Sequence, residues 1–353
     1  MNKEYFASMN TSNGFCSYFN EIFSPDRLEA VYIIKGGSGT GKSTMMKRIA
    51  EHFEKDGLEA ERFYCSSDKD SLDGIIIDKR VAVLDGTAPH TTDPKYPGAV
   101  EEIVNLSGCW NTERLKESKK EIISLVSKKN ASYSKGYSFL SAAGKLSYEI
   151  RKITSEKIKT DKMQQAIHRF FKQGGFKGAG NKTSVRLTSV ICAEGRVRLH
   201  SFEDESDKIC LVTKTHGCAG VFFKEFLDAS STYNLERVIS YDPVCPDEIN
   251  AIYFPEIRLC VVTAEGSEDV YDEKYKVFNL ERFIDKDVLC ENRAKLRFAN
   301  KCLNALIDGA VDSFVDAKNY HEKIEEIYTS CVDFKTVRRI TELLINNISD
   351  IIH

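Results

Sequence analysis

The stretch 31–46, VYIIKGGSGTGKSTMM, constrains this chain more than any other part of its sequence. Its first four residues are apolar and strand-like. The glycine-rich loop after them leads into an apolar-periodic run that predicts a helix from Thr44 to about Phe53. Four residues match the pattern GxxxxGK(S/T): Gly36, Gly41, Lys42 and Ser43. A strand before this pattern and a helix after it are the context expected of a phosphate-binding P-loop.

Each residue type in the loop has a chemical reason. Glycines let the backbone fold tightly enough to point its N–H groups at a phosphate, and the following helix adds its positive end. Lys42 can reach the β- and γ-phosphates, and the Ser43 hydroxyl can hold Mg²⁺. The predicted nucleotide-binding residues are Gly36, Gly37, Ser38, Gly39, Thr40, Gly41, Lys42, Ser43 and Thr44. The alternative is a glycine-rich turn that binds nothing.

An aspartate later in the chain supports the same prediction. The apolar run 81–84 ends at Asp85. An aspartate at the carboxyl end of a buried strand, beside a P-loop, is where such proteins hold Mg²⁺. We therefore predict Ser43 and Asp85 as magnesium ligands, against the alternative that Asp85 caps the following turn.

His90 follows at once, in the segment GTAPHTTDP (86–94). It could contact a γ-phosphate, act as acid or base near neutral pH, or cap a turn. The predicted catalytic residues are Lys42, Asp85 and His90. Three more carboxylates follow the predicted strand 59–65 and could orient an acceptor, although turn formation and helix capping explain them more simply: Asp68, Asp70 and Asp73.

The second half of the chain repeats the first. Four segments align in the same order, at offsets of about 175 to 181 residues. They are FASMNTSNGFCSY with LTSVICAEGRVRL, AVYIIKGGSGTGKSTMMKRI with DKICLVTKTHGCAGVFFKEF, SLDGIIIDKRVAVLDGTA with EINAIYFPEIRLCVVTAEG, and GYSFLSAA with AVDSFVDA. We predict two tandem α/β domains of the three-layer P-loop NTPase type, 1–180 and 181–353, each with a mainly parallel sheet and a helical appendage. The alternative is two unrelated α/β domains in which strands and helices alternate in a similar way.

The second loop lacks the residues that would bind phosphate and Mg²⁺ in the first. KTHGCAGV (214–221) stands where GGSGTGKS stood, without the lysine or the serine, and Thr263 lies near the position of Asp85. This predicts a pseudo-site that keeps the fold and binds little or no nucleotide. A weak site that uses Lys214 or His216 is the alternative.

Charge divides the two halves. Residues 1–180 carry a net charge of +5 and residues 181–353 one of −8, and the segment 114–177 alone holds 16 basic and 5 acidic residues. Most of this segment belongs to a predicted helical insertion at about 113–171, followed by a Gly- and Lys-rich linker at 172–183. Its helices could cover the nucleotide as a cationic lid, bind a phosphate-rich partner such as nucleic acid, or form a solvated face. The cations available to a lid are Lys119, Lys120, Lys128, Lys129, Arg151 and Lys152.

Composition limits the class of protein. A chain of 353 residues with 42% hydrophobic and 29% charged residues is typical of a globular protein with two domains. No run approaches the roughly 20 apolar residues of a membrane span, and MNKEYFASMN lacks the apolar core of a signal peptide. Eleven cysteines without a CxxC pair favour reduced thiols in a cytoplasm over a zinc site or a disulfide framework.

The combination of KGGSGTGKST, SSDKDSLDGIII, VLDGTAPHTTDPKYPGAVEEIVNL and a duplicated second half resembles a family of bacterial tandem P-loop ATPase-like proteins. The resemblance covers nearly the whole chain and implies a P-loop fold and ATP binding. Members of that family often carry a recognisable P-loop in the second half as well, and this sequence departs from them at 214–221.

Two functions are consistent with these features. The first is an ATPase or phosphotransferase that uses Mg²⁺-ATP at the N-terminal loop. The second is a nucleotide-dependent switch with little turnover, and nucleic acid could stimulate either through 114–177. The sequence contains no NKxD-type guanine-reading motif, which favours ATP over GTP.

Overall fold

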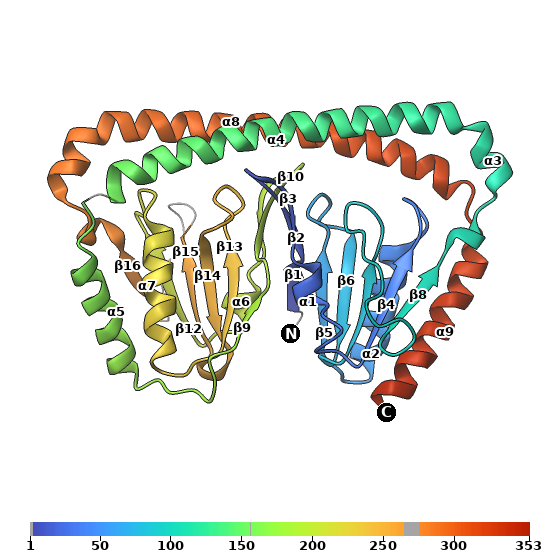
Figure 1. The fold of residues 1–353 in the computed structure, drawn as a ribbon, viewed down its shortest axis with the longest axis horizontal. Helices are drawn as coiled ribbons and strands as arrows, with labels where there is room; N and C mark the ends of the chain where they lie inside the picture. Colours follow the sequence, from blue (N-terminus) through green and yellow to red (C-terminus); the bar gives the residue numbers. More distant parts are fainter. Residues whose placement is uncertain (1–2, 156, 265–274) are drawn as a thin grey trace.

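The computed structural model describes residues 3–155, 157–264 and 275–353. Two six-stranded sheets stand side by side beneath two long antiparallel helices, α4 and α8, which form a roof over both (Figure 1). The α/β class with two mostly parallel sheets is thereby confirmed. Within the described ranges, no helix is both long and apolar enough to cross a membrane.

The elements of the first half lie between Lys3 and Gly174. Its strands are β1 Lys3–Phe6, β2 Ser8–Thr11, β3 Gly14–Ser17, β4 Ala30–Lys35, β5 Ala60–Tyr64, β6 Leu72–Ile77, β7 Val81–Asp85 and β8 Glu101–Asn105. Its helices are α1 Phe19–Ile22, α2 Lys42–Lys55, η1 Ser107–Cys109, α3 Thr112–Glu117, α4 Lys119–Ser155 and α5 Thr160–Gly174.

The elements of the second half follow in the same succession. Its strands are β9 Thr183–Val185, β10 Ser189–Cys192, β11 Gly195–Arg198, β12 Lys208–Thr213, β13 Arg237–Tyr241, β14 Ile249–Phe254, β15 Leu259–Thr263 and β16 Tyr275–Asn279. Its helices are α6 Ser201–Asp204, α7 Ala219–Ser231, η2 Pro255–Ile257, η3 Leu280–Phe283, α8 Lys286–Thr329 and α9 Phe334–Ile352.

The two sheets have the same strand order. It is β1-β5-β6-β7-β4-β8 in the first sheet and β9-β13-β14-β15-β12-β16 in the second. In each, the third strand in that order is antiparallel to both neighbours and the other pairings are parallel. The matching order and directions are what a duplicated domain would produce.

The strands β4 and β7 are apolar along nearly their whole length because both faces of the sheet are covered. One face packs against α2 and α9. The other shares a hydrophobic cluster with α1 and with strands of the second sheet. The inner faces of the two sheets therefore form one core between the halves.

The halves meet at equivalent residues. The backbone of Phe6 donates to Leu187 O at 2.8 Å, and Leu187 N donates back to Phe6 O at 3.2 Å. These residues start the first pair of aligned sequence segments, 181 positions apart. The contact thus lies where a two-fold axis relating the halves would pass.

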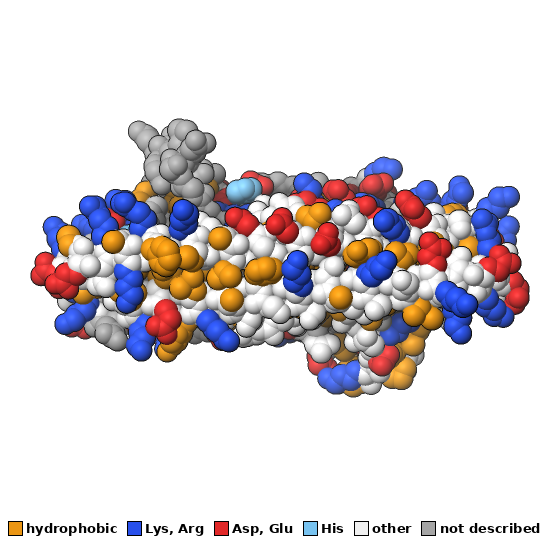
Figure 2. All heavy atoms as spheres, turned by 90° about the horizontal axis from the view of Figure 1, so that it is seen from above, with side chains coloured by type: hydrophobic (Ala, Val, Ile, Leu, Met, Phe, Trp, Pro, Cys, Tyr) orange, Lys and Arg blue, Asp and Glu red, His pale blue; other side chains and the backbone are white. Residues whose placement is uncertain are grey.

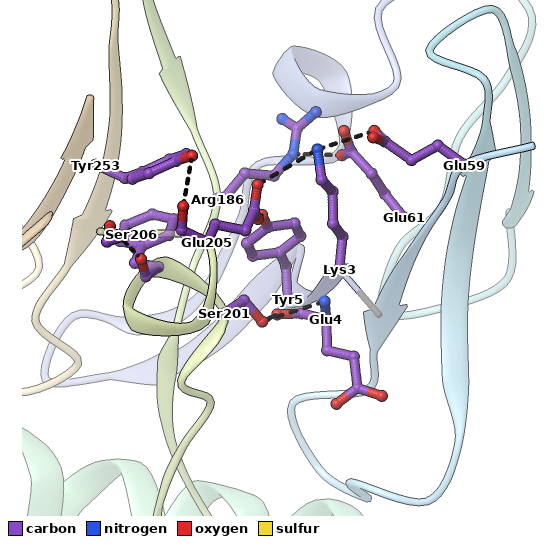
Figure 3. Close-up of polar contacts among 11 residues, drawn as sticks. Lys3, Glu4, Tyr5, Glu59, Glu61, Arg186, Ser201, Glu205, Ser206 and Tyr253 are labelled. Carbon is purple, nitrogen blue, oxygen red and sulfur yellow. Dashed lines mark hydrogen bonds and ion pairs between the residues drawn. The ribbon is translucent and has the colours of Figure 1, made fainter. Parts of the chain in front are cut away.

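A polar network beside this contact also joins the halves (Figure 3). Lys3 Nζ lies 3.4 Å from Glu205 Oε2, and the Tyr5 hydroxyl donates to Glu205 Oε1 at 2.6 Å. Arg186 Nε donates to Glu61 Oε2 at 2.8 Å. Burial and the nearby Glu205 carboxylate raise the pKa of Tyr5, so its hydroxyl stays protonated and continues to donate.

The helices that follow each sheet are exchanged between the halves. Helix α4 starts above the first sheet and crosses the roof, and α5 then packs against α7 of the second half (Figure 1). Helix α8 crosses in the opposite direction, and α9 packs against α2 of the first half. The sequence analysis placed the helices at 113–171 with the first half. In space, α5 instead covers the second sheet.

The two roof helices approach closely at small residues, which leads to a stability prediction. A Cβ added to Gly136 of α4 would lie 2.5 Å from Phe314 Cε1 of α8. We expect Gly136→Ala to lower the free energy of unfolding by about 1–2 kcal/mol, because overpacking outweighs the better helix propensity of alanine. Urea unfolding measures this, with Gly108→Ala as the control, since no atom lies within 4 Å of a Cβ there. A more stable Gly136→Ala variant would contradict the predicted clash.

Candidate functional site

The glycine-rich loop (residues 36–43) joins β4 to α2 at the edge where β4 and the parallel strand β7 both end. Gly39 and Gly41 have φ values of +68° and +85°, a region that side chains with a Cβ rarely adopt. In the part of the chain that the structure describes, the backbone N–H groups of residues 40–44 donate to no protein group. The start of α2 therefore presents open donors and a positive helix end to an anion.

Lys42 and Asp85 meet at this edge. Lys42 Nζ donates to Gly36 O at 2.9 Å and Gly37 O at 2.8 Å, and lies 3.4 Å from Asp85 Oδ2. Asp85 Oδ1 accepts from the backbone N–H of Thr87 at 2.9 Å. The sequence analysis gave two alternatives for Asp85, a magnesium ligand beside the loop or a cap of the following turn. Asp85 does cap the turn, through Thr87, and it also lies beside Lys42 of the loop.

Ser43 has one partner in the structure. Its hydroxyl oxygen accepts from the backbone N–H of Leu72 at 2.9 Å and keeps a second lone pair. Among the described residues, no group of three His, Cys, Asp or Glu side chains could hold a metal alone. Mg²⁺ in nucleotide sites needs few protein ligands, because phosphates and water supply the rest. The oxygen atoms of Ser43 and Asp85 fit that role.

His90 forms a buried pair with Asp73. His90 Nε2 lies 3.0 Å from Asp73 Oδ2, and both side chains are less than a tenth exposed. The His90 ring stacks on Phe19 with centroids 4.4 Å apart. The carboxylates after β5 have different partners. Asp68 pairs with Lys318 at 3.3 Å and accepts from the backbone N–H of Asp70, as in the predicted turn, whereas Asp73 lies beside His90.

The predicted residues line one cavity of about 820 Å³, which includes the loop, Asp85 and His90. Three buried atoms of its lining residues have no hydrogen-bond partner within the described ranges: Asp73 Oδ2, His90 Nδ1 and Trp110 Nε1. The pair of Asp73 and His90 is thus a close approach of two polar atoms that does not have the geometry of a hydrogen bond. Lys129 of α4 also lines the cavity, as a cationic lid would require. Sequence reasoning missed the lining residues of α8 and α9: His321, Ile324, Glu325, Tyr328, Thr329 and Phe334.

The last turns of α8 lie directly on the loop. Thr329 Oγ1 is 3.3 Å from Gly39 O, and a Cβ on Gly39 would come within 2.6 Å of that hydroxyl. Burial raises the pKa of the Glu325 carboxyl, while a hydrogen bond from the Gly39 backbone acts to lower it. Glu325 therefore lies close to the loop backbone that a bound phosphate would use.

Burial shifts the pKa values of two side chains that line the cavity. Burial first, and then the positive charges of Lys129 and Lys42, lower the pKa of His321 to about 4. Burial also lowers the pKa of Lys129 itself. Since burial disfavours the charged form of either side chain, His321 is neutral at neutral pH.

The second loop (214–221) is occupied by the protein's own side chains. His216 Nε2 lies 2.9 Å from Glu281 Oε1, and Lys214 contacts the same carboxylate. Gly220 takes the position of Lys42, and a Cβ there would lie 2.5 Å from Glu248 Oε2. Arg151 of α4 forms an ion pair with Glu248, and the adjoining cavity measures only about 280 Å³.

Comparison with known proteins adds no match. Neither a protein-family model, nor a curated protein, nor a solved structure matches this chain. The resemblance to tandem P-loop proteins therefore stays a prediction, and the chemistry of the cavity is argued from its geometry.

Proposed function

We propose that the cavity at the glycine-rich loop binds Mg²⁺-ATP, and that the protein hydrolyses it or transfers its γ-phosphoryl group. One observation carries the proposal. Residues 40–44, whose backbone N–H groups donate to no described protein group, line one cavity together with the Lys42 side chain at the start of a 14-residue helix. Backbone donors, a helix N-terminus and a lysine together form a phosphate site.

The residues of the cavity have separate roles in this proposal. Lys42 exchanges its carbonyl partners for phosphate oxygens and, with the backbone N–H groups, stabilises charge on the transferred group. Ser43 and Asp85 would hold Mg²⁺, which supplies neutralising charge at the phosphates. In this proposal His90, which lies beside Asp73, would accept a proton from the attacking water or hydroxyl.

The contact of α8 with the loop favours a second candidate function, a switch. Glu325 and Thr329 lie against Gly39 of the loop, so a phosphate that binds there would shift the end of a 44-residue helix. That helix also runs over the second half. Such a protein would bind ATP and turn over slowly, with the roof transmitting the bound state.

Phosphate release separates the two functions. An enzyme should release phosphate from ATP with Mg²⁺ and not with EDTA. Asp85→Asn should then lower kcat by about 100-fold, the scale for losing one preorganised electrostatic contact. Asp78→Asn, in a turn after β6, serves as the control and should leave kcat unchanged. If Mg²⁺-ATP binds tightly but no phosphate is released, with or without added acceptors, the protein acts as a switch and not as an enzyme.

Proton uptake should accompany nucleotide binding below neutral pH. The pKa of His321 is about 4 in the free protein, against 6.5 for the ordinary side chain. Phosphates beside it favour the charged form and raise that pKa, so binding near pH 5.5 takes up protons, whereas binding near pH 8 takes up none. Calorimetry in two buffers of different ionisation enthalpy measures the uptake. His321→Asn should remove most of it, and equal enthalpies in both buffers at pH 5.5 would contradict the prediction.

A further inference from the structure

A second hollow lies on the outer side of the second half, between α5 and the edge strand β16. It measures about 350 Å³ and continues onto η3. Four cations line it, Lys162, Arg169, Lys276 and Arg282, and no described carboxylate does. Within the described ranges, none of the four forms an ion pair. We call this surface the cationic groove.

The fold itself does not require these cations, because the first half has a matching place between α9 and β8. The halves correspond there at an offset of 174 residues, since the bridges Trp110 to Val332 and Ile158 to Ile284 are equivalent. The cations correspond to Thr336, Leu343, Glu102 and Gly108. At these four positions the matching place carries one carboxylate and no cation, although Arg339 stands there in place of Gln165. The cationic groove carries four cations at the same positions.

The rest of the groove suits a ligand that also carries hydrogen-bonding groups. Its lining includes the amides of Gln165 and Gln173, which can both donate and accept. The amide oxygen of Asn279 accepts from the backbone N–H of Glu281, which leaves its NH₂ group as a donor. Phe170 and Phe278 supply apolar surface beneath them. Amides and apolar surface next to a row of cations match a chain of phosphates that bears planar bases.

Cations outnumber carboxylates on the adjoining surface of α5 and the start of α8. Exposed Lys172, Arg293, Lys295 and Arg297 lie there beside exposed Asp161, Asp287 and Glu291, and Lys159 pairs with Asp285 at 3.7 Å. Seen from above, Lys and Arg side chains lie at both ends of the roof, with acidic side chains among them and along its middle (Figure 2). The excess of cations along α5 and the start of α8 would act on a polyanion beyond the groove itself.

We propose that the cationic groove binds single-stranded nucleic acid, with the phosphodiester backbone along the four cations. The site is separate from the ATP cavity and goes beyond the proposed function. A single strand can follow a hollow of this size, whereas a stiff duplex would meet only its rim. An acidic peptide would use the cations but leave the amides and the apolar surface without a role.

Fluorescence anisotropy of a labelled 20-nucleotide oligothymidine with the full chain tests this proposal. Replacing all four groove cations by glutamine should weaken binding at least tenfold near 100 mM salt. It should also reduce the slope of log K against log salt concentration by about 3. Each lost phosphate contact on a single strand removes roughly 0.7 from that slope, and four contacts are lost. The matched control replaces four exposed cations of α2 and α9, the helices that cover the first sheet, by glutamine: Lys55, Lys335, Arg338 and Arg339. It should change binding less than threefold.

Three outcomes would overturn the proposal. The first is that the oligonucleotide does not bind, and the second is that both quadruple variants weaken binding equally. The third is that polyglutamate of equal charge competes as well as the unlabelled oligonucleotide. Thermal unfolding of both variants checks that the fold is intact. The single variants Lys276→Gln and Arg282→Gln test the same site with a smaller change, and each should reduce the salt slope by about 0.7.

Discussion

Lys42→Ala should abolish detectable ATP binding by the whole chain. Lys42 is the cation of the loop that contacts Asp85, and its side chain is only 11% exposed. Without it, the phosphates lose a charge-assisted partner and meet the uncompensated carboxylate of Asp85 instead. Losing one member of a buried charge pair costs about 2–5 kcal/mol, so affinity should fall by about 30-fold to several thousand-fold. Calorimetry with Mg²⁺-ATP, compared with GTP, measures this.

The same titration decides whether the second loop binds nucleotide. In wild type we expect one site per chain, because Glu248 already lies beside the start of α7 and Glu281 holds His216. Lys214→Ala is the matched control and should leave affinity and stoichiometry unchanged. Two sites in wild type, or binding that survives Lys42→Ala, would show that the second loop is not a pseudo-site.

Neither half should fold when it is produced alone. A fragment of residues 1–180 lacks α9, whose buried side chains Val337, Leu344 and Ile348 cover α2. Burying each of them is worth about 1.5–3 kcal/mol, so together they contribute about 4–9 kcal/mol. A typical domain has a net stability of only about 5–15 kcal/mol. The loss is thus comparable to the whole stability, and circular dichroism and urea unfolding should show no cooperative transition.

Producing both fragments together provides the control for this prediction. The fragments 1–180 and 181–353 should associate through the exchanged helices and regain cooperative unfolding, because every contact of the full chain is then available. A fragment 1–180 that unfolds cooperatively by itself would show that its own helices can cover α2. In that case the helix exchange would not be needed for stability.

The sequence by itself determined the local features of the fold. The apolar runs at 31–34 and 81–84 became the parallel strands β4 and β7, and the predicted helix after the glycine-rich loop became α2. The positions of Lys42, Ser43 and Asp85 at one sheet edge also followed. The reason is local: a strand, a turn and a helix adjacent in sequence have few ways to pack, and parallel strands end at the same edge.

Only the tertiary structure decided what covers the loop. Glu325 and Thr329 lie nearly 290 residues beyond Gly39 in sequence, and helical periodicity shows which face is apolar but not which sheet that face will cover. Both sheets offer similar apolar faces. The sequence pattern alone therefore fits a helix that packs on the sheet of its own half and equally one that packs on the sheet of the other half. Packing over the full length of α4 and α8 selects the crossing. That choice places His321 in the ATP cavity that we propose, and it places Arg151 and α5 on the second half.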